Sequence, residues 1–222
     1  MINGVRFKVC GLTSQVDAAM ADVHGADFLG FIFYPKSARY ISLDSYHVMS
    51  GNLPRKPRVA VTVDPSVDDL SRLKVAGFDF FQVHFPLTTP LARVEAWAAE
   101  VTPERLWLAP RVPPGEAIEP ALFALAGTFL FDTYQAGTYG GTGHTGDWQA
   151  FARLQEEHSR LNWILAGGLN AENIHAALTA TRARLVDVNS GIESVPGIKS
   201  AEKLQRFCDV LREMPARSRP PM

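Results

Sequence analysis

A cysteine and an aspartate stand where they could exchange protons with a substrate. Cys10 closes the apolar run FKVCG at 7–11, and Asp132 directly follows the apolar run TFLF at 128–131. A thiolate can remove a carbon-bound proton, and a neutral carboxylic acid can protonate a leaving oxygen. Such a pair suits an enolisation or an aldose-to-ketose rearrangement.

Both residues also have a purely structural interpretation. A lone cysteine after an apolar run is more often a small buried hydrophobe, and Asp132 could cap a helix or order a loop. A free thiol has a pKa of about 8.5, so a thiolate base needs a neighbouring positive charge or dipole. The second cysteine, Cys208, has the spacing of a packing residue on a helix.

Three further side chains could bind or orient a substrate. Arg39 lies in the stretch YPKSARYIS at 34–42 and could clamp a carboxylate through two hydrogen bonds, unless it simply faces solvent. The proline and the preceding aromatic residues fix this stretch and favour the clamp. His84, two residues after Gln82, could shuttle a proton, although a histidine at a strand end is more often structural. We assign Gln82 and His84 supporting roles.

These residues belong to a regular alternation of short apolar runs and longer amphipathic stretches. Amphipathic patterns predict helices over 14–25, 66–77, 90–100 and 170–180, several of which open on Ser, Asn or Pro. The predicted strands lie at 7–11, 27–34, 58–64, 78–85, 105–112, 128–134, 162–168 and 185–191.

Eight such units predict a closed (β/α)8 TIM barrel in a single domain, because strictly alternating strands and helices pair in parallel with right-handed crossovers. The rival is an open doubly wound sheet, but its G-x-G-x-x-G turn is absent after the first strand. We expect the barrel to span 1–214, followed by a disordered tail at 215–222.

In a barrel, the chemistry lies at the carboxyl ends of the strands. The polar or special residues predicted there are Cys10, Lys36, Arg39, Asp64, Gln82, His84, Arg111, Asp132, Gly167, Gly168, Asn189, Ser190 and Gly191.

Glycine-rich stretches follow three of the predicted strands. They are GGTGHTGDW at 140–148, which precedes a helix expected to begin near Asp147, AGGLN at 166–170 and NSGIE at 189–193. Such loops let backbone N–H groups approach an anion, and the loops after strands seven and eight commonly bind phosphate in these barrels. Plain flexible turns are the alternative, but three loops at one rim favour a phosphate monoester.

Composition narrows the class of partner. The formal net charge of -1 over 222 residues provides no basic surface for nucleic acid or an anionic membrane. Two distant cysteines without spaced histidines do not form a zinc set. No signal peptide or membrane-spanning run is recognisable. We therefore expect a cytoplasmic protein that binds a small molecule, with no metal, nucleic-acid or membrane partner, acting as a monomer or homodimer.

Taken together, these motifs resemble those of phosphoribosylanthranilate isomerases, the barrel enzymes of tryptophan biosynthesis. The matching stretches run almost from end to end: KVCGLT, GADFLGFIFYPKSARYIS, VAVTVDPS, FFQVHF, LFDT, GGTGHTGDW, ILAGGLNAENI and VDVNSGIESVPGIKS. The K-x-C-G start, the P-x-S-x-R loop and GGTG-x-x-x-DW are specific in combination.

This resemblance implies an Amadori rearrangement without metal or organic cofactor. It makes Asp132 the general acid, Cys10 the general base and Arg39 the ligand of the anthranilate carboxylate. It implies that the phosphate lies on the loops that contain Gly141, Gly143, Gly167, Gly168, Ser190 and Gly191.

Three positions depart from the family's pattern. Asn189 replaces a serine, Gly146 replaces a phenylalanine, and Phe85 replaces a glycine. We expect these changes to affect phosphate binding and loop closure more than the chemistry.

Other barrels fit less well. Cys10 argues against the histidine-pathway isomerase and the dual-substrate form, which use a carboxylate there, and the lysine and glutamate set of indole-glycerol-phosphate synthase is absent. A non-catalytic or substrate-shifted sugar-phosphate-binding barrel remains the alternative.

Overall fold

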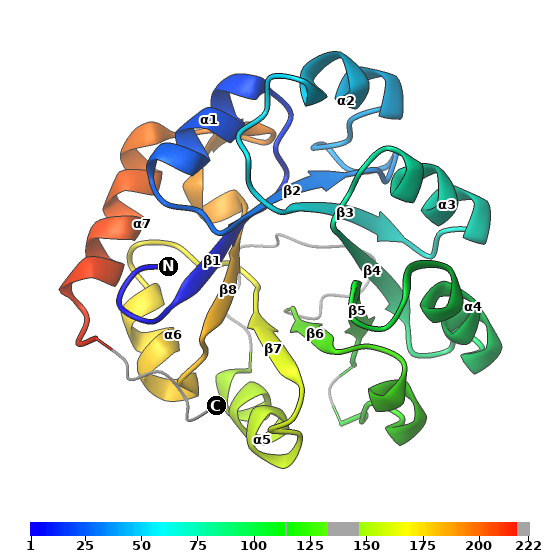
Figure 1. Cartoon of the computed structure of the whole chain (residues 1–222). Coiled ribbons are helices and arrows are strands. Elements are labelled where there is room, and N and C mark those ends of the chain that lie inside the picture. The colour runs from blue at the N-terminus through cyan, green and yellow to red at the C-terminus, as the bar shows by residue number, and fades with distance from the viewer. Residues whose placement is uncertain (114, 133–146, 217–222) are drawn as a thin grey trace.

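The structure is a closed barrel of eight parallel strands surrounded by helices (Figure 1). It is a computed structural model and describes residues 1–113, 115–132 and 147–216. Each strand pairs in parallel with the next, and β1 pairs with β8 to close the barrel. The strands are β1 (Arg6–Val9), β2 (Phe28–Ile32), β3 (Arg58–Val63), β4 (Phe80–Pro86), β5 (Leu106–Arg111), β6 (Thr128–Phe131), β7 (Asn162–Leu165) and β8 (Leu185–Val188). The predicted TIM barrel is confirmed.

Helices cover the outside of this barrel. They are α1 (Gln15–Val23), α2 (Leu43–Ser50), α3 (Val67–Val75), α4 (Leu91–Val101), α5 (Trp148–Glu157), α6 (Ile174–Thr181) and α7 (Ala201–Glu213). The predicted cap residues hold several helix starts: the side chain of Ser14 accepts from the Asp17 N–H, and Asp147 accepts from the Ala150 N–H. Ser66 and Asp69 form a reciprocal capping box at α3.

The connection between β5 and β6 breaks the expected alternation. Within the described part of this connection, the only helix is the short 3-10 helix η1 (Pro120–Ala124). Proline lacks the N–H that a helix interior needs, and Pro113 and Pro120 both fall in this connection. Strict strand–helix alternation is therefore wrong at this one crossover.

The core has two layers that follow from the alternation of side chains along each strand. Outward residues such as Leu29 and Phe31 pack against the helices, together with the buried Cys208 of α7, which is a packing residue as predicted. A smaller cluster uses the alternate positions and fills the barrel interior: Cys10, Phe28, Val59, Val61, Trp107, Ala109, Leu130, Ile164, Ala166 and Leu185. Cys10 thus lies at the boundary between the packed interior and the strand ends.

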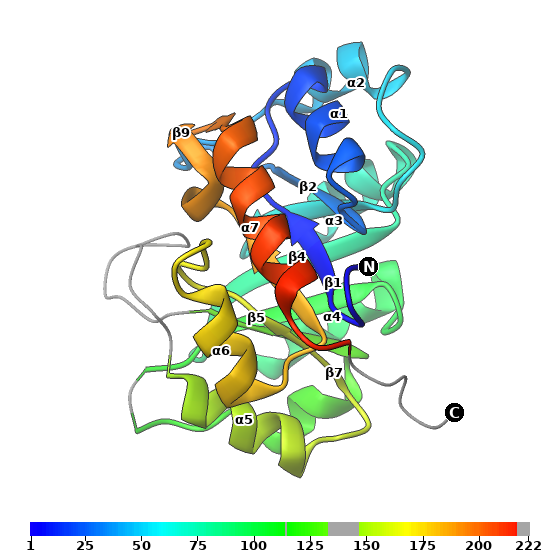
Figure 2. The same cartoon turned by 90° about the vertical axis from the view of Figure 1, so that its left-hand side faces the viewer.

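A short antiparallel hairpin follows β8 and the 3-10 helix η2 (Ser190–Ile192). Its strands are β9 (Glu193–Val195) and β10 (Ile198–Lys199). Figure 2 shows β9 at the opposite end of the barrel from the N-terminus, which is the end where the strands finish. The hairpin therefore stands beside the predicted active-site rim.

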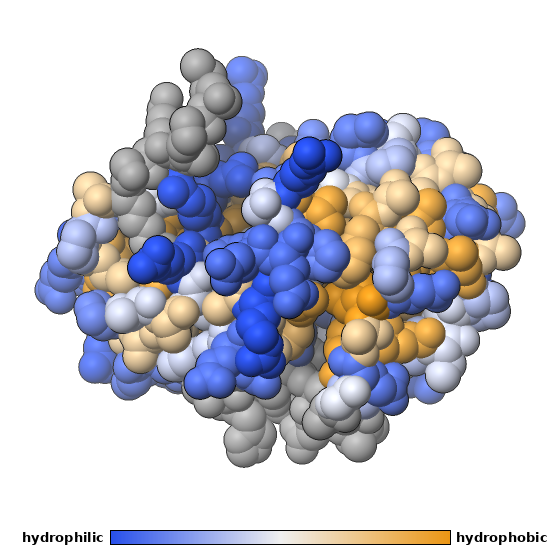
Figure 3. All heavy atoms as spheres, turned by 90° about the horizontal axis from the view of Figure 1, so that it is seen from below, coloured by the Kyte–Doolittle hydropathy of each residue, from blue (hydrophilic) through white to orange (hydrophobic). Residues whose placement is uncertain are grey.

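The surface seen in Figure 3 carries polar and charged side chains around a smaller apolar area. None of the helices in the described residues is long and apolar enough to cross a bilayer. Helix α7 ends at Glu213, and residues 217–222 lie outside the described ranges, so the predicted disordered tail at 215–222 stays a prediction.

Candidate active site

One pocket at the carboxyl ends of the strands gathers most of the predicted site residues. Its lining includes Cys10, Arg39, Gln82, His84, Asp132, Gly167, Gly168, Asn189 and Ser190. These residues come from six different strand ends, so only a closed barrel brings them together. Gly141, Gly143 and the departure at Gly146 lie outside the described residues.

Cys10 follows β1 directly and lines this pocket. Its backbone N–H donates to the Val188 carbonyl of the neighbouring strand at 2.9 Å, and the residue is only 4% exposed. Burial raises the pKa of the Cys10 thiol, and the Asp187 carboxylate acts in the same direction. The ammonium of Lys8 opposes both, since it stabilises a thiolate. Lys8 is thus the neighbouring positive charge that a thiolate base needs.

Lys8 itself is fully buried in β1 and pairs with Asp187 of β8. Its Nζ atom lies 2.6 Å from Oδ2 of Asp187. Burial acts to lower the pKa of Lys8, but Asp187 and the Cys10 sulfur outweigh this effect and raise it. Gly30 leaves room for this arrangement, because a Cβ atom there would come within 2.7 Å of Lys8 Cε and 3.3 Å of Cys10 Sγ.

His84 and Gln82 lie on the same face of β4 and contact each other in the pocket. The Nε2 atoms of the two side chains are 2.8 Å apart. Burial lowers the pKa of His84 to about 4, and Lys8 adds to this effect. His84 is therefore neutral at physiological pH, which suits a hydrogen-bonding role better than that of a cationic proton donor.

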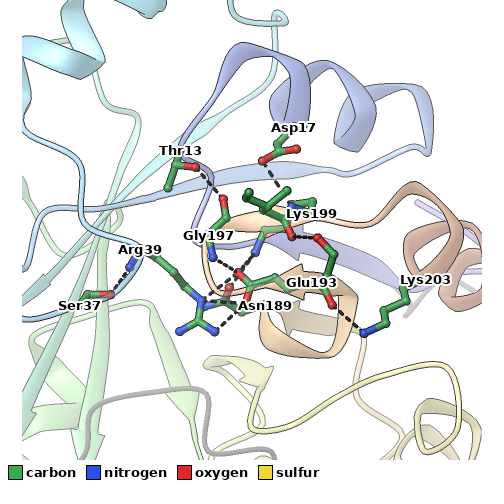
Figure 4. Close-up of polar contacts among 11 residues, drawn as sticks. Thr13, Asp17, Ser37, Arg39, Asn189, Glu193, Gly197, Lys199 and Lys203 are labelled. Atoms are coloured by element: carbon green, nitrogen blue, oxygen red, sulfur yellow. Dashed lines mark hydrogen bonds and ion pairs between the residues drawn. The ribbon is translucent and has the colours of Figure 1, made fainter.

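Arg39 reaches the pocket from the segment after β2 and forms an ion pair with Glu193 of β9 (Figure 4). Its Nε lies 2.9 and 3.1 Å from the two carboxylate oxygens, and its Nη2 lies 2.6 Å from Oε2. This hydrogen bonding to Glu193 raises the pKa of Arg39. The predicted clamp thus already holds one carboxylate of the protein, while Arg39 still lines the pocket.

Lys199 joins this pair to the end of β8. Its Nζ donates to Glu193 Oε1 and to Asn189 Oδ1, both at 2.8 Å. Asn189 is the residue that replaces the family's serine, and its amide reaches the hairpin as well as lining the pocket.

The loops after β7 and β8 lie in direct contact. A Cβ atom on Gly191 would lie only 2.0 Å from the Leu169 carbonyl oxygen, so glycine is required for this approach. Asn173 Nδ2 donates to the Gly168 carbonyl at 2.9 Å and fixes the first of the two loops. Among the loop, turn and cap hydrogen bonds of the described residues, none is donated to a backbone carbonyl by the N–H of Gly168, Ser190 or Gly191. This geometry can bind a phosphate.

Asp132 and Phe85 lie on opposite sides of the barrel wall. Asp132 follows β6 and lines the pocket, as predicted. Phe85 points away from the pocket into the outer core, where its ring centroid lies 5.5 Å from that of Trp97. The departure at Phe85 therefore changes packing between β4 and α4 and leaves the pocket lining unaltered.

Four charged residues of the site were missed from the sequence: Lys8, Asp187, Glu193 and Lys199. A signal existed for the first two, because an ionic residue inside an apolar strand needs a buried partner. Nothing comparable marked Glu193 and Lys199, whose segment has the composition of an ordinary loop.

The fold and the pocket define a (β/α)8 barrel with titratable side chains at the carboxyl ends of its strands, the arrangement used by barrel enzymes. Residues 7–210 match the family model described as N-(5'phosphoribosyl)anthranilate (PRA) isomerase. The chain belongs to this family.

Individual relatives agree with the family match. An N-(5'-phosphoribosyl)anthranilate isomerase of Pseudomonas putida is 36% identical over 220 residues, which cover 94% of this chain and 98% of the relative. The solved structure of phosphoribosyl anthranilate isomerase from Thermotoga maritima is 31% identical, with a TM-score of 0.77. The match covers 95% of this chain and 100% of the other. A second isomerase structure, in complex with reduced 1-(o-carboxyphenylamino)-1-deoxyribulose 5-phosphate, is 29% identical with a TM-score of 0.71, and the match covers 95% of this chain and 100% of the other.

Proposed function

We propose that the protein catalyses the Amadori rearrangement of N-(5-phosphoribosyl)anthranilate to 1-(2-carboxyphenylamino)-1-deoxyribulose 5-phosphate in tryptophan biosynthesis. The observation that carries this proposal is the single pocket that contains Cys10, Asp132, Arg39 and the glycine loops after β7 and β8. The family membership and the ligand in the related complex support the same reaction.

The substrate has two anionic ends, and the pocket offers a binding group for each. The phosphate is assigned to the loops at Gly167–Gly168 and Ser190–Gly191, together with Gly141 and Gly143 in the segment outside the described residues. The anthranilate carboxylate is assigned to Arg39. The reacting sugar carbons then lie between these ends, over the mouth of the barrel.

Asp132 acts first in this proposal, as the general acid. It donates a proton to the ribose ring oxygen, and the bond between that oxygen and C1 breaks to give a protonated Schiff base. Cys10 then removes the proton from C2, and the electron pair of this C–H bond neutralises the iminium nitrogen. The resulting enolamine gains a proton at C1 and loses one from the C2 hydroxyl, which yields the ketone.

Lys8 supports the thiolate form of Cys10 that this step requires. Burial favours the protonated thiol. The adjacent ammonium and the cationic Schiff base act in the opposite direction and favour proton loss. His84, held neutral, and Gln82 are assigned to hydrogen bonding with the sugar hydroxyls. Ring opening is the single bond cleavage between heavy atoms in this scheme, and its protons are exchanged between the substrate, Asp132 and Cys10.

All of the proposed residues come from one chain, so the site is complete in a monomer and would be repeated in a homodimer. The described cysteines, Cys10 and Cys208, are both free thiols, which is consistent with action in the cytoplasm.

The test follows the fluorescence of phosphoribosylanthranilate, generated in place from anthranilate and phosphoribosyl pyrophosphate by the preceding transferase. Addition of the purified protein should remove the fluorescence, and mass spectrometry with borohydride trapping should identify the ketose phosphate. A protein that binds the reduced product but leaves the substrate unchanged would instead be a sugar-phosphate-binding barrel. Turnover of a different aminoaldose phosphate would indicate a shifted substrate.

A further inference from the structure

We propose that the β9–β10 hairpin selects for the substrate carboxylate, and that Glu193 is the positioning residue through which it acts on Arg39. This inference rests on the proposed function and deepens it. It assigns a role in substrate recognition to a segment that supplies no proton-transfer group.

The first support is the geometry of the guanidinium. Arg39 uses its Nε–H and one Nη2–H in the ion pair with Glu193, so the edge of the guanidinium that carries Nε and Nη2 faces the hairpin. The side-chain hydrogen bonds of Arg39 to described residues all come from Nε and Nη2, and none comes from Nη1. The Nη1 side of a planar guanidinium is therefore left for a ligand, and its direction is set by where Glu193 lies.

The second support is that Glu193 is itself held on several sides. It is only 5% exposed, and its Oε1 accepts from Lys199 Nζ at 2.8 Å and from the Gly197 N–H at 3.2 Å. Lys203 Nζ donates to its backbone carbonyl at 2.7 Å. Burial acts to raise the pKa of Glu193, but its hydrogen bonds to Arg39 and Lys199 and the positive charges of these two residues outweigh burial and lower the pKa, so Glu193 stays ionised.

The charges of this cluster also favour an anionic ligand. Arg39 and Lys199 are cationic and Glu193 is anionic, so the three together carry one net positive charge. Glu193 thus orders the arginine without cancelling the attraction that the cluster exerts on a carboxylate.

The hairpin is tied to the loops that carry the other site residues. Thr13 Oγ1, after β1, donates to the Gly197 carbonyl at 2.7 Å, and the Lys199 N–H donates to Asp17 of α1 (Figure 4). Arg39 and Asn189 both pack against Gly11, where a Cβ atom would lie 2.8 Å from Arg39 Cδ and 2.7 Å from Asn189 Oδ1. The position of Arg39 is therefore fixed relative to Cys10, which precedes Gly11.

A purely charge-neutralising role for Glu193 makes the opposite prediction. If Glu193 only compensated the half-buried Arg39, its neutralisation would leave a stronger positive field and would tighten carboxylate binding. If Glu193 positions Arg39, its neutralisation loosens the guanidinium and weakens carboxylate binding.

The experiment compares two ligands: the reduced product analogue, and the same compound made from aniline, which lacks the carboxylate. Their Kd values are measured by calorimetry for the wild-type protein and for Glu193→Gln, together with kcat and KM for the substrate. We expect the Kd of the carboxylated analogue and the KM to rise by about tenfold or more in Glu193→Gln. The Kd of the aniline analogue and kcat should change by less than about threefold.

A double variant, Glu193→Gln/Lys199→Met, covers the case in which an unpaired Lys199 prevents folding. It keeps one net positive charge on the cluster and should show the same selective loss. Asp64→Asn is the matched control, because Asp64 pairs with Arg93 at 2.7 Å beside the end of β3 without lining the pocket. It should leave both Kd values unchanged.

Two results would overturn the proposal. One is an equal loss of affinity for both analogues, which would make Glu193 a structural residue, and the other is tighter binding of the carboxylated analogue. A wild-type protein that neither turns over the substrate nor binds either analogue would contradict the proposed function itself.

Discussion

The ammonium of Lys8 and the carboxylate of Asp187 are 2.6 Å apart inside the barrel, and the ammonium also interacts with the sulfur of Cys10. Oδ1 of Asp187 has no hydrogen-bond partner among the described residues. The pair thus places a buried positive charge beside the proposed base. Such a pair adds little stability, because desolvation offsets the attraction between its charges. The two members of the pair act on the thiol in opposite directions: Lys8 favours the thiolate of Cys10, and Asp187 opposes it.

Replacing Lys8 by Met should therefore raise the pKa of Cys10. In a Cys208→Ala background, which leaves Cys10 as the single cysteine, iodoacetamide alkylation should slow at pH 8 and its pH profile should move to higher pH. The free energy of unfolding should also fall by about 3–5 kcal/mol, because Asp187 loses its partner. Lys56→Met, which breaks a half-exposed pair with Asp22, is the control. An unchanged alkylation profile in Lys8→Met would show that Lys8 does not influence the pKa of Cys10.

His84 should make the protein less stable in mild acid. Its pKa is about 4 in the folded state, below the ordinary value of 6.5, so between these pH values the unfolded chain binds a proton that the folded chain does not. The free energy of unfolding should fall as the pH drops from 6.5 towards 4, by up to about 3 kcal/mol at about 1.4 kcal/mol per pH unit.

Urea denaturation at pH 7.5 and pH 5 measures this effect. His84→Gln keeps a hydrogen-bonding partner for Gln82 but cannot titrate, so it should lose less stability between the two pH values than the wild-type protein. Equal losses in the two proteins would mean that folding does not lower the pKa of His84.

Gly191→Ala should separate the two proposed phosphate loops. Its Cβ atom would lie 2.0 Å from a backbone oxygen of Leu169, and a backbone atom cannot turn away as a flexible side chain can. We expect the Kd for the reduced product analogue to rise by about tenfold or more and the melting temperature to fall. Gly51→Ala is the matched control, because nothing lies within 4 Å of a Cβ there. Wild-type affinity in Gly191→Ala would argue against a phosphate site that depends on this contact.

Much of the fold was predictable because the apolar runs and helix caps act locally. Ser14 and Ser66 precede the helices that their side chains cap, and apolar strands buried on both faces favour a barrel of parallel strands. The described part of the connection between β5 and β6 contains no α-helix, and Pro113 and Pro120 are the sequence signal for this.

The site was predictable only in part, because its ion pairs join residues that are distant in the chain. Cys10 and Asp132 could be proposed from strand ends alone, and both line the pocket. The partner of Arg39, in contrast, lies 154 residues away in a hairpin whose strands are too short to give a periodic pattern. Such pairing depends on how the barrel closes, and local propensity carries no information about it.

The roles of the proposed acid and base are tested by comparing Cys10→Ala and Asp132→Asn with the wild-type protein in two assays. One is turnover of phosphoribosylanthranilate, and the other is the Kd for the reduced product analogue. Loss of a general acid or base removes an interaction made in the transition state. Each variant should therefore lose about 10²- to 10⁴-fold in kcat while keeping the fold and a Kd within about threefold of the wild-type value. Near-wild-type turnover by Cys10→Ala would rule out Cys10 as the general base and leave the cysteine as a core residue.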